Sequence, residues 1–271
     1  MNLKIFQVDA FTKEVFGGNP AAVCPLDAWL PDDTMKNIAA ENNLAETAFF
    51  VKKGDSYDIR WFTPAVEVNL CGHATLASAH VIFNELKTET ELVRFNSKSG
   101  ELRVAKDGDR LILDFPAYPV KEIEPIAELA LALSIVPLKY WETQGNMVMA
   151  LVEHEDKVRN LTPDINRLAQ LPYDEVIITA KGETADFVSR MFAPRIGIPE
   201  DPVTGAIHCS LIPYWAGELG KEKLFAKQVS KRGGELFCEL AGDRVKIGGN
   251  AAVYLKGEIY VEETTPKSIG A

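Results

Sequence analysis

Arg60-Trp61-Phe62-Thr63-Pro64 returns in the same chain as Arg190-Met191-Phe192-Ala193-Pro194, an offset of 130 positions. Four further matches run in the same order, with offsets that drift only from 127 to 134. They are Gly18-Asn19 with Gly145-Asn146, Glu46 with Glu175 before apolar runs, Ser97–Leu102 with Ser230–Leu236, and Asp109-Arg110 with Asp243-Arg244. Ordered matches at a nearly fixed spacing indicate an internal duplication. The chain is therefore predicted to contain two copies of one fold of about 130 residues, placed as domains 1–117 and 118–258.

Each copy shows the pattern of a sheet around a buried helix. Apolar Tyr57, Ile59 and Trp61 alternate with polar residues, which is the period of a half-buried strand. Leu111, Leu113 and Phe115 recur at the same spacing further on. Between these strands, Ala74–Phe83 is largely apolar on every face, and so is its counterpart Ala206–Trp215. A helix that is apolar all round must be buried. The predicted fold class is α+β, with two pseudo-symmetric domains, each a curved, barrel-like mixed sheet around a central helix.

The composition excludes several classes of partner. Among 271 residues, 39 acidic against 29 basic side chains give a net charge of −10, whereas nucleic acid or an anionic membrane calls for a basic face. No apolar run approaches the roughly 20 residues of a membrane-spanning helix. The four cysteines lie far apart, without the spacing of a disulfide framework or a zinc knuckle. With no signal-type apolar stretch at the N-terminus, the protein is predicted to be cytoplasmic and to bind a small molecule.

Two glycine-containing segments, Glu67–Ala74 and Glu200–Ile207, align residue by residue just before the predicted helices. In each, a strand ends and a glycine permits the turn into a helix, whose free N–H groups attract anions. The copies differ in polar residues, because His73 aligns with Ala206 and Asp201 has no acidic counterpart. An asymmetric substrate with a carboxylate is therefore predicted to bind between the copies. The predicted substrate-binding residues are Asn19, Gly72, Ala74, Thr204, Gly205 and Ala206.

Glu46 is a third candidate for chemistry, beside His73 and Asp201. It stands within the apolar stretch Leu44-Ala45-Glu46-Thr47-Ala48-Phe49-Phe50. Apolar surroundings disfavour the charged form of a carboxylate, which suits a general acid and base. The pattern alone favours a solvated glutamate on the outer face of a strand, and it leaves the acid-base role open.

Four motifs follow one another over nearly the whole chain: Gly17-Gly18-Asn19-Pro20-Ala21-Ala22-Val23, Asn43-Leu44-Ala45-Glu46-Thr47-Ala48-Phe49, Cys71-Gly72-His73-Ala74-Thr75 and Glu200-Asp201-Pro202-Val203-Thr204-Gly205. In these motifs the chain resembles the phenazine biosynthesis PhzF-like family. The resemblance implies the diaminopimelate-epimerase-like fold, with the active site between two similar domains and residues 259–271 returning to the first. It is also compatible with a homodimer.

The resemblance also implies an activity. The family's reaction is the isomerisation of trans-2,3-dihydro-3-hydroxyanthranilate, in which one glutamate moves a proton without a cofactor. Carried over, that catalytic glutamate is Glu46, with His73 and Asp201 as its active-site companions. Family members often have Ser-Ala after Thr-Gly in the last motif, whereas this chain has Ala206-Ile207. A hydroxyl that could contact the substrate is absent, which leaves the identity of the substrate open.

Three other interpretations stay open. Cys71 stands where related epimerases carry a thiol acid or base, but the opposed position holds Pro202, so a two-thiol amino-acid racemase is incomplete. A metal set of His208, Asp201 and Glu46 is conceivable but disfavoured, and no metal is predicted. A catalytically silent binding or scaffold protein that retains the cleft is the third.

Overall fold

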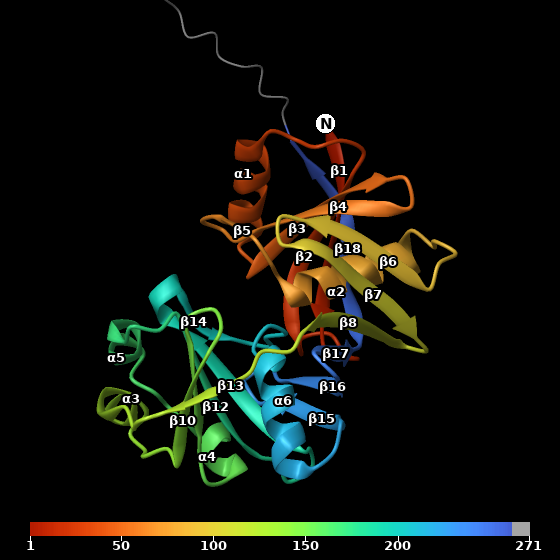
Figure 1. Cartoon of the computed structure of the whole chain (residues 1–271). Coiled ribbons are helices and arrows are strands. Elements are labelled where there is room, and N and C mark those ends of the chain that lie inside the picture. Colours follow the sequence, from red (N-terminus) through yellow and green to blue (C-terminus); the bar gives the residue numbers. More distant parts are fainter. Residues whose placement is uncertain (262–271) are drawn as a thin grey trace, which may run out of the picture.

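The chain folds into two lobes that share one continuous sheet (Figure 1). The computed structural model describes residues 1–261. The first lobe contains β1 (Asn2–Ala10), β2 (Asn19–Leu26), α1 (Asp32–Asn42), β3 (Glu46–Lys53), β4 (Ser56–Phe62), β5 (Glu67–Val68), α2 (Gly72–His80), η1 (Val81–Glu85), β6 (Leu92–Ser97), β7 (Gly100–Asp107) and β8 (Arg110–Pro116). The second contains β9 (Lys121–Ile123), α3 (Ala127–Leu133), β10 (Lys139–Thr143), β11 (Met147–Leu151), α4 (Glu155–Arg159), α5 (Ile165–Gln170), β12 (Glu175–Lys181), β13 (Phe187–Ala193), η2 (Pro194–Ile196), β14 (Ile198–Asp201), α6 (His208–Leu219), β15 (Lys223–Gln228), β16 (Gly234–Ala241) and β17 (Arg244–Gly249). A last strand, β18 (Ala251–Tyr260), follows.

Strand pairing repeats from one lobe to the other. In the first lobe the neighbours run β1-β2-β3-β4-β6-β7-β8, with β2–β3 and β4–β6 parallel and the other pairs antiparallel. In the second lobe they run β10-β11-β12-β13-β15-β16-β17, with β11–β12 and β13–β15 parallel and the others antiparallel. The short strands β5 and β14 add to the equivalent strands β4 and β13. The predicted α+β class and the predicted duplication are confirmed.

Two strand pairings join segments that lie far apart in the sequence. β8 pairs antiparallel with its counterpart β17 and so joins the lobes. β18 pairs antiparallel with β1 along its whole length, so the chain returns to the first lobe from Ala251 onward. This return begins before the predicted tail of 259–271, and residues 262–271 of that tail lie outside the described residues. The domain limits at 117 and 258 stay predictions.

The recurring arginine has the same structural role in both lobes. Arg60 of β4 donates two hydrogen bonds to Glu67 of β5, at 2.8 and 2.9 Å. Arg190 of β13 donates to Glu200 of β14 in the same way, at 2.6 and 2.9 Å. Two parallel N–H donors from one arginine hold a carboxylate in a defined orientation and also stabilise its negative charge. Each pair therefore holds the short strand that leads to the aligned glycines Gly72 and Gly205, which come just before the buried parts of α2 and α6.

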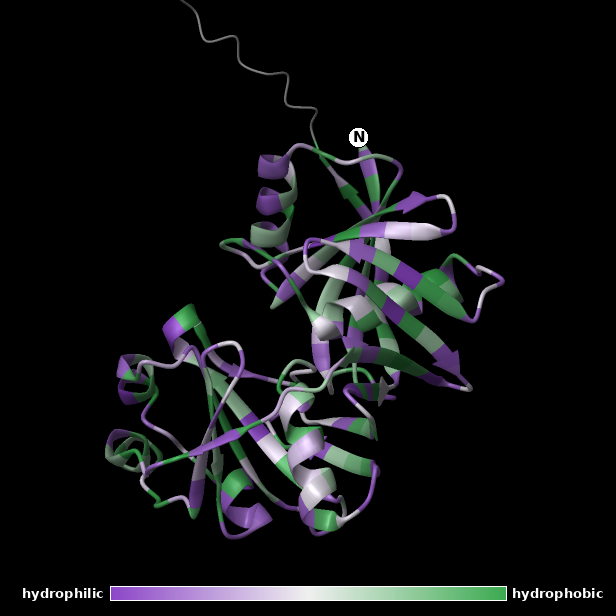
Figure 2. Ribbon diagram, in the orientation of Figure 1, coloured by the Kyte–Doolittle hydropathy of each residue, from purple (hydrophilic) through white to green (hydrophobic). Residues whose placement is uncertain are grey.

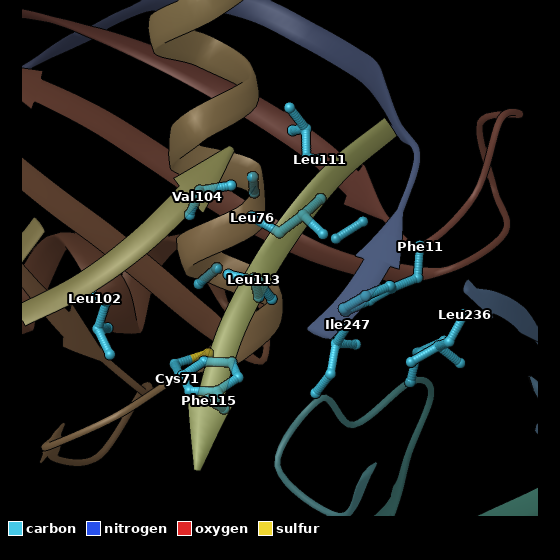
Figure 3. Packing of buried hydrophobic residues seen from close by; sticks show 14 of the residues in the cluster. Phe11, Cys71, Leu76, Leu102, Val104, Leu111, Leu113, Phe115, Leu236 and Ile247 are labelled. Carbon is cyan, nitrogen blue, oxygen red and sulfur yellow. The ribbon is translucent and has the colours of Figure 1, made fainter. Parts of the chain in front are cut away.

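The helices α2 and α6 lie inside their lobes, as the sequence predicts. In α2 every residue from His73 to Ala79 is buried, and the helix continues into the π-helical turn η1. α6 begins at His208, two residues later than predicted, because Gly205–Ile207 form a turn. One hydrophobic cluster joins both lobes, and Figure 3 shows part of it, with Leu76 of α2 and Leu113 of β8 among the side chains between helix and strand.

The remaining helices cover the outer faces of the sheet. α1 buries Met35 and Ile38 in a separate cluster with residues of β2 and β3. Figure 2 shows that α1 is largely hydrophilic apart from this buried face. Within residues 1–261, no helix combines the length and the apolar character that crossing a membrane requires.

Gly18 fixes the turn that places Asn19 at the start of β2. Its φ is +60°, and a Cβ there would lie 2.1 Å from the carbonyl oxygen of Ala10. Gly18→Ala is therefore expected to lower the free energy of unfolding by at least about 1–3 kcal/mol, as measured by urea denaturation. Gly54 has the same φ but nothing within 4 Å of such a Cβ, so Gly54→Ala is the matched control. Equal losses in both variants would contradict the steric argument.

Candidate functional site

A cavity of about 810 Å³ is lined by residues of both lobes. Its volume lies in the range that small-molecule sites occupy. Ionisable groups of the first lobe in its wall are Glu46, Cys71 and His73, and those of the second lobe are Glu175 and Asp201. The repeat thus brings chemically different side chains from equivalent regions to one space.

Glu46 and His73 meet at the wall of this cavity. Glu46 is the first residue of β3, and its side chain is 12% exposed. His73 is the second residue of α2, and its Nε2 lies 3.1 Å from Oε2 of Glu46. The contact has the distance of an ion pair but lacks the alignment of a hydrogen bond, so Nε2 has no hydrogen-bond partner among the described residues. Glu46 therefore gains a cationic neighbour when His73 is protonated, without being committed to a hydrogen bond with it.

The other ring nitrogen of His73 faces Cys71 and Asn19. Its Nδ1 lies 3.5 Å from Sγ of Cys71 and 3.2 Å from Nδ2 of Asn19. The amide nitrogen of Asn19 already donates to Asp201 at 2.8 Å and to the carbonyl of Val203 at 2.9 Å, which uses both of its hydrogens. Cys71 is therefore the group that can share a proton with Nδ1.

Charge at this site is set by Glu46 and His73. Burial alone would lower the pKa of His73, but Cys71 and Glu46 together raise that pKa well above the usual 6.5. Burial and the Glu46 carboxylate raise the pKa of Cys71 above its usual 9.0. A thiol with a raised pKa stays neutral near pH 7, so the Glu46 carboxylate is the charge that favours a protonated His73. Cys71 is correspondingly a poor thiolate.

Asp201, the last residue of β14, connects the two lobes beneath the cavity. Its Oδ1 accepts the hydrogen bond from Asn19 of the first lobe, and its Oδ2 accepts one from the hydroxyl of Thr204. Burial raises the pKa of Asp201 from 3.8 to about 6, although His73 and the hydrogen bonds from Thr204 and Asn19 act in the opposite direction. Asp201 therefore anchors the cavity wall and can also hold a proton at mildly acidic pH.

Gln228 completes this network, and the sequence gives no signal for it. It is fully buried at the end of β15. Its amide oxygen accepts the N–H of Thr204 at 2.9 Å, and its amide nitrogen donates to the carbonyl of Asp201 at 2.8 Å. A single glutamine in an ordinary strand pattern cannot be told from a surface residue, because its role depends on the parallel pairing of β13 with β15.

Some of the predicted substrate-binding residues line the cavity, and others are buried behind its wall. Four of them line the cavity: Gly72, Thr204, Gly205 and Ala206. Asn19 and Ala74 are fully buried behind that wall, and the amide nitrogen of Asn19 is taken by Asp201 and Val203. Direct contact of Asn19 or Ala74 with a substrate stays a prediction.

The two glycine turns touch each other. A Cβ on Gly72 would lie 3.5 Å from Cα of Gly205, which is ordinary van der Waals contact. The N–H groups of the first helical turn have no partner within their own helix. Both glycines line the cavity, so the predicted anion would approach the N–H groups next to them from the cavity side, and not through a gap between the two turns.

Three donor atoms at the site are close enough for a metal ion. The donor atoms of Glu46, Cys71 and His73 all lie within 4.8 Å of one another. Among residues 1–261, this is the cluster of potential metal ligands that lie this close together. Zinc accepts carboxylate, thiolate and imidazole ligands, but the raised pKa of Cys71 disfavours the thiolate. His208 lies elsewhere: its Nδ1 contacts the carbonyl of Thr204 at 2.8 Å, and burial lowers its pKa to about 4.

Comparison with known proteins assigns the chain to a family. The sequence model for the phenazine biosynthesis-like protein family matches residues 8–257. An uncharacterized isomerase of Pseudomonas aeruginosa is 52% identical over 259 residues, which cover 96% of this chain and 99% of that protein. The crystal structure of a PhzF-family phenazine biosynthesis protein from Enterococcus faecalis is 47% identical, with a TM-score of 0.94 over 96% of this chain and 100% of its own. The fold alone is shared with a "predicted epimerase" of Pseudomonas aeruginosa, 18% identical with a TM-score of 0.75 over 96% of this chain and 100% of that one. The chain therefore belongs to the phenazine biosynthesis-like, PhzF-like protein family, whose members share this epimerase-like fold.

Proposed function

We propose that this protein is an isomerase that moves a proton on a small cyclic or amino-acid-like substrate with a carboxylate. The observation that carries the proposal is the Glu46 carboxylate at the cavity wall, 3.1 Å from Nε2 of His73. A base that exchanges protons with substrate must lie within reach of the ligand and must not be fully committed to other hydrogen bonds. Relatives that are named isomerases support the same class of reaction.

The proposed reaction has two proton transfers. The Glu46 carboxylate accepts a proton from an activated carbon, and the electron pair of the broken C–H bond moves into the adjacent unsaturated system. Protonated His73 and the N–H groups next to Gly72 and Gly205 stabilise the negative charge that develops on the substrate. Protonation at a second position then completes the isomerisation without net oxidation or reduction.

The thiol alternative has less support in the geometry. Burial raises the pKa of Cys71, and its Sγ lies 3.5 Å from His73. The residue aligned with Cys71 in the second repeat is Thr204, whose hydroxyl donates a hydrogen bond to Asp201 and is no second thiol. Glu46 is therefore the better candidate for the proton-transferring group.

Incubation of the protein in D₂O with trans-2,3-dihydro-3-hydroxyanthranilate tests the proposal, with proline as the amino-acid comparison. We expect deuterium to appear at carbon in substrate or product, as measured by proton NMR and mass spectrometry. Exchange of proline that is lost in Cys71→Ala and kept in Glu46→Gln would favour the thiol alternative. Thermal stabilisation by these compounds without any exchange would favour a binding protein.

A further inference from the structure

Glu175 is the structural counterpart of Glu46. Each is the first residue of its strand, β12 or β3, and each strand lies parallel to its preceding neighbour. The register agrees as well, because Thr47 pairs with Phe62 and the equivalent Val176 pairs with Phe192. Both glutamates line the same cavity. The duplication therefore supplies two carboxyl groups, one from each lobe, to one space.

The two glutamates differ in the side chain that lies next to their carboxyl group. Glu46 lies against His73, whereas the aligned position in the second repeat is Ala206, which offers no charge or hydrogen bond. Oε2 of Glu175 is fully buried and has no hydrogen-bond partner among the described residues. A buried carboxylate without a partner is unfavourable, and protonation removes that cost.

The charged groups around Glu175 also favour its neutral form. Burial, together with the smaller effects of the Asp201 and Asp174 carboxylates, raises the pKa of Glu175 from 4.5 to about 7. The only cation paired with these acids among the described contacts is Arg195, which lies 3.2 Å from Asp174. A carboxyl group whose environment favours its protonated form suits the role of the acid in a proton-transfer reaction.

We propose that Glu175 is the proton donor that works with Glu46 across the cavity, an inference that rests on the proposed isomerase function. Glu46 takes a proton from one carbon of the substrate as that C–H bond breaks. The O–H bond of Glu175 breaks as its proton joins the second position of the substrate, and its electron pair stays on the carboxylate. Water then carries a proton away from Glu46 and returns one to Glu175, so the enzyme is restored and the product is an isomer of the substrate.

Carboxyl titration tests the protonation state without any substrate. In full-length protein labelled with ¹³C at the glutamate side-chain carboxyl, Glu175 is the resonance that disappears in Glu175→Gln. We expect its chemical shift to titrate with a midpoint near 7. Glu183→Gln, which removes an exposed glutamate, is the control for the assignment and should leave the Glu175 resonance and its midpoint unchanged. A midpoint near 4.5 for Glu175 would overturn the inference.

Isotope exchange then separates the roles of the two glutamates, with trans-2,3-dihydro-3-hydroxyanthranilate in D₂O as the probe. Glu175→Gln is expected to keep the exchange of the substrate C–H and to slow product formation by on the order of 10²-fold. Glu46→Gln is expected to lose both. Product formation by Glu175→Gln at the wild-type rate would overturn the role of Glu175 and leave the proposed function intact. Full activity of Glu46→Gln would overturn the proposed function itself.

Discussion

Replacing Glu46 with glutamine is expected to lower the isomerisation rate by on the order of 10²- to 10⁴-fold. Glutamine keeps the size of the side chain and its place at the start of β3, but it cannot accept a proton from carbon. The measurement is the initial rate of product formation, accompanied by the rate of deuterium exchange into substrate.

The control for this prediction is Glu41→Gln. Glu41 is an exposed glutamate of α1, five positions before Glu46, and its replacement should leave the rate unchanged. Cys71→Ala should retain most of the activity, because a neutral buried thiol contributes little to proton transfer. Full activity in Glu46→Gln together with complete loss in Cys71→Ala would contradict the assignment and identify the thiol as the acting group.

The duplication made the fold predictable from sequence. The recurrence of Arg60 and Arg190 reflects the bidentate pairs with Glu67 and Glu200, so these residues mark equivalent positions in space. The start of α6 was predicted two residues too early, at Ala206 instead of His208. The residues of this turn are apolar, so the pattern does not distinguish them from the helix. The backbone just before the turn is held by a long-range hydrogen bond from the N–H of Thr204 to Gln228, which no local pattern specifies.

The site was predictable to a lesser degree. The motifs pointed to Glu46, His73 and Asp201, and all three line the cavity. The contact between Asn19 and Asp201 joins residues 182 positions apart, and no local pattern specifies it. Glu175 was visible in the sequence as the partner of Glu46 in the repeat. The burial of its Oε2 without a hydrogen-bond partner among the described residues is visible only in the structure.

The stability of Glu175→Gln is expected to depend on pH differently from that of the wild type. The folded pKa of Glu175 is raised to about 7, so the folded state binds its proton more tightly than the unfolded state does. This favourable contribution is fully present below about pH 4.5 and is lost as the pH rises toward about 7. One pKa unit corresponds to about 1.4 kcal/mol, so ionising this group costs on the order of 3 kcal/mol of folding stability.

Glutamine does not titrate, so the variant should gain stability relative to the wild type between pH 4.5 and 7 and gain no more above that range. Urea unfolding of both proteins at pH 4.5, 6 and 7.5 measures this difference, and Glu183→Gln should show none. A difference that stays constant with pH would mean that Glu175 ionises normally. A loss of stability in the variant as pH rises would mean that a cation pairs with the ionised group. Since Oε2 of Glu175 has neither a cation nor a hydrogen-bond donor among residues 1–261, we expect the gain. Such a cost in stability at a cavity residue is expected if the shifted pKa of Glu175 serves the proposed proton transfer.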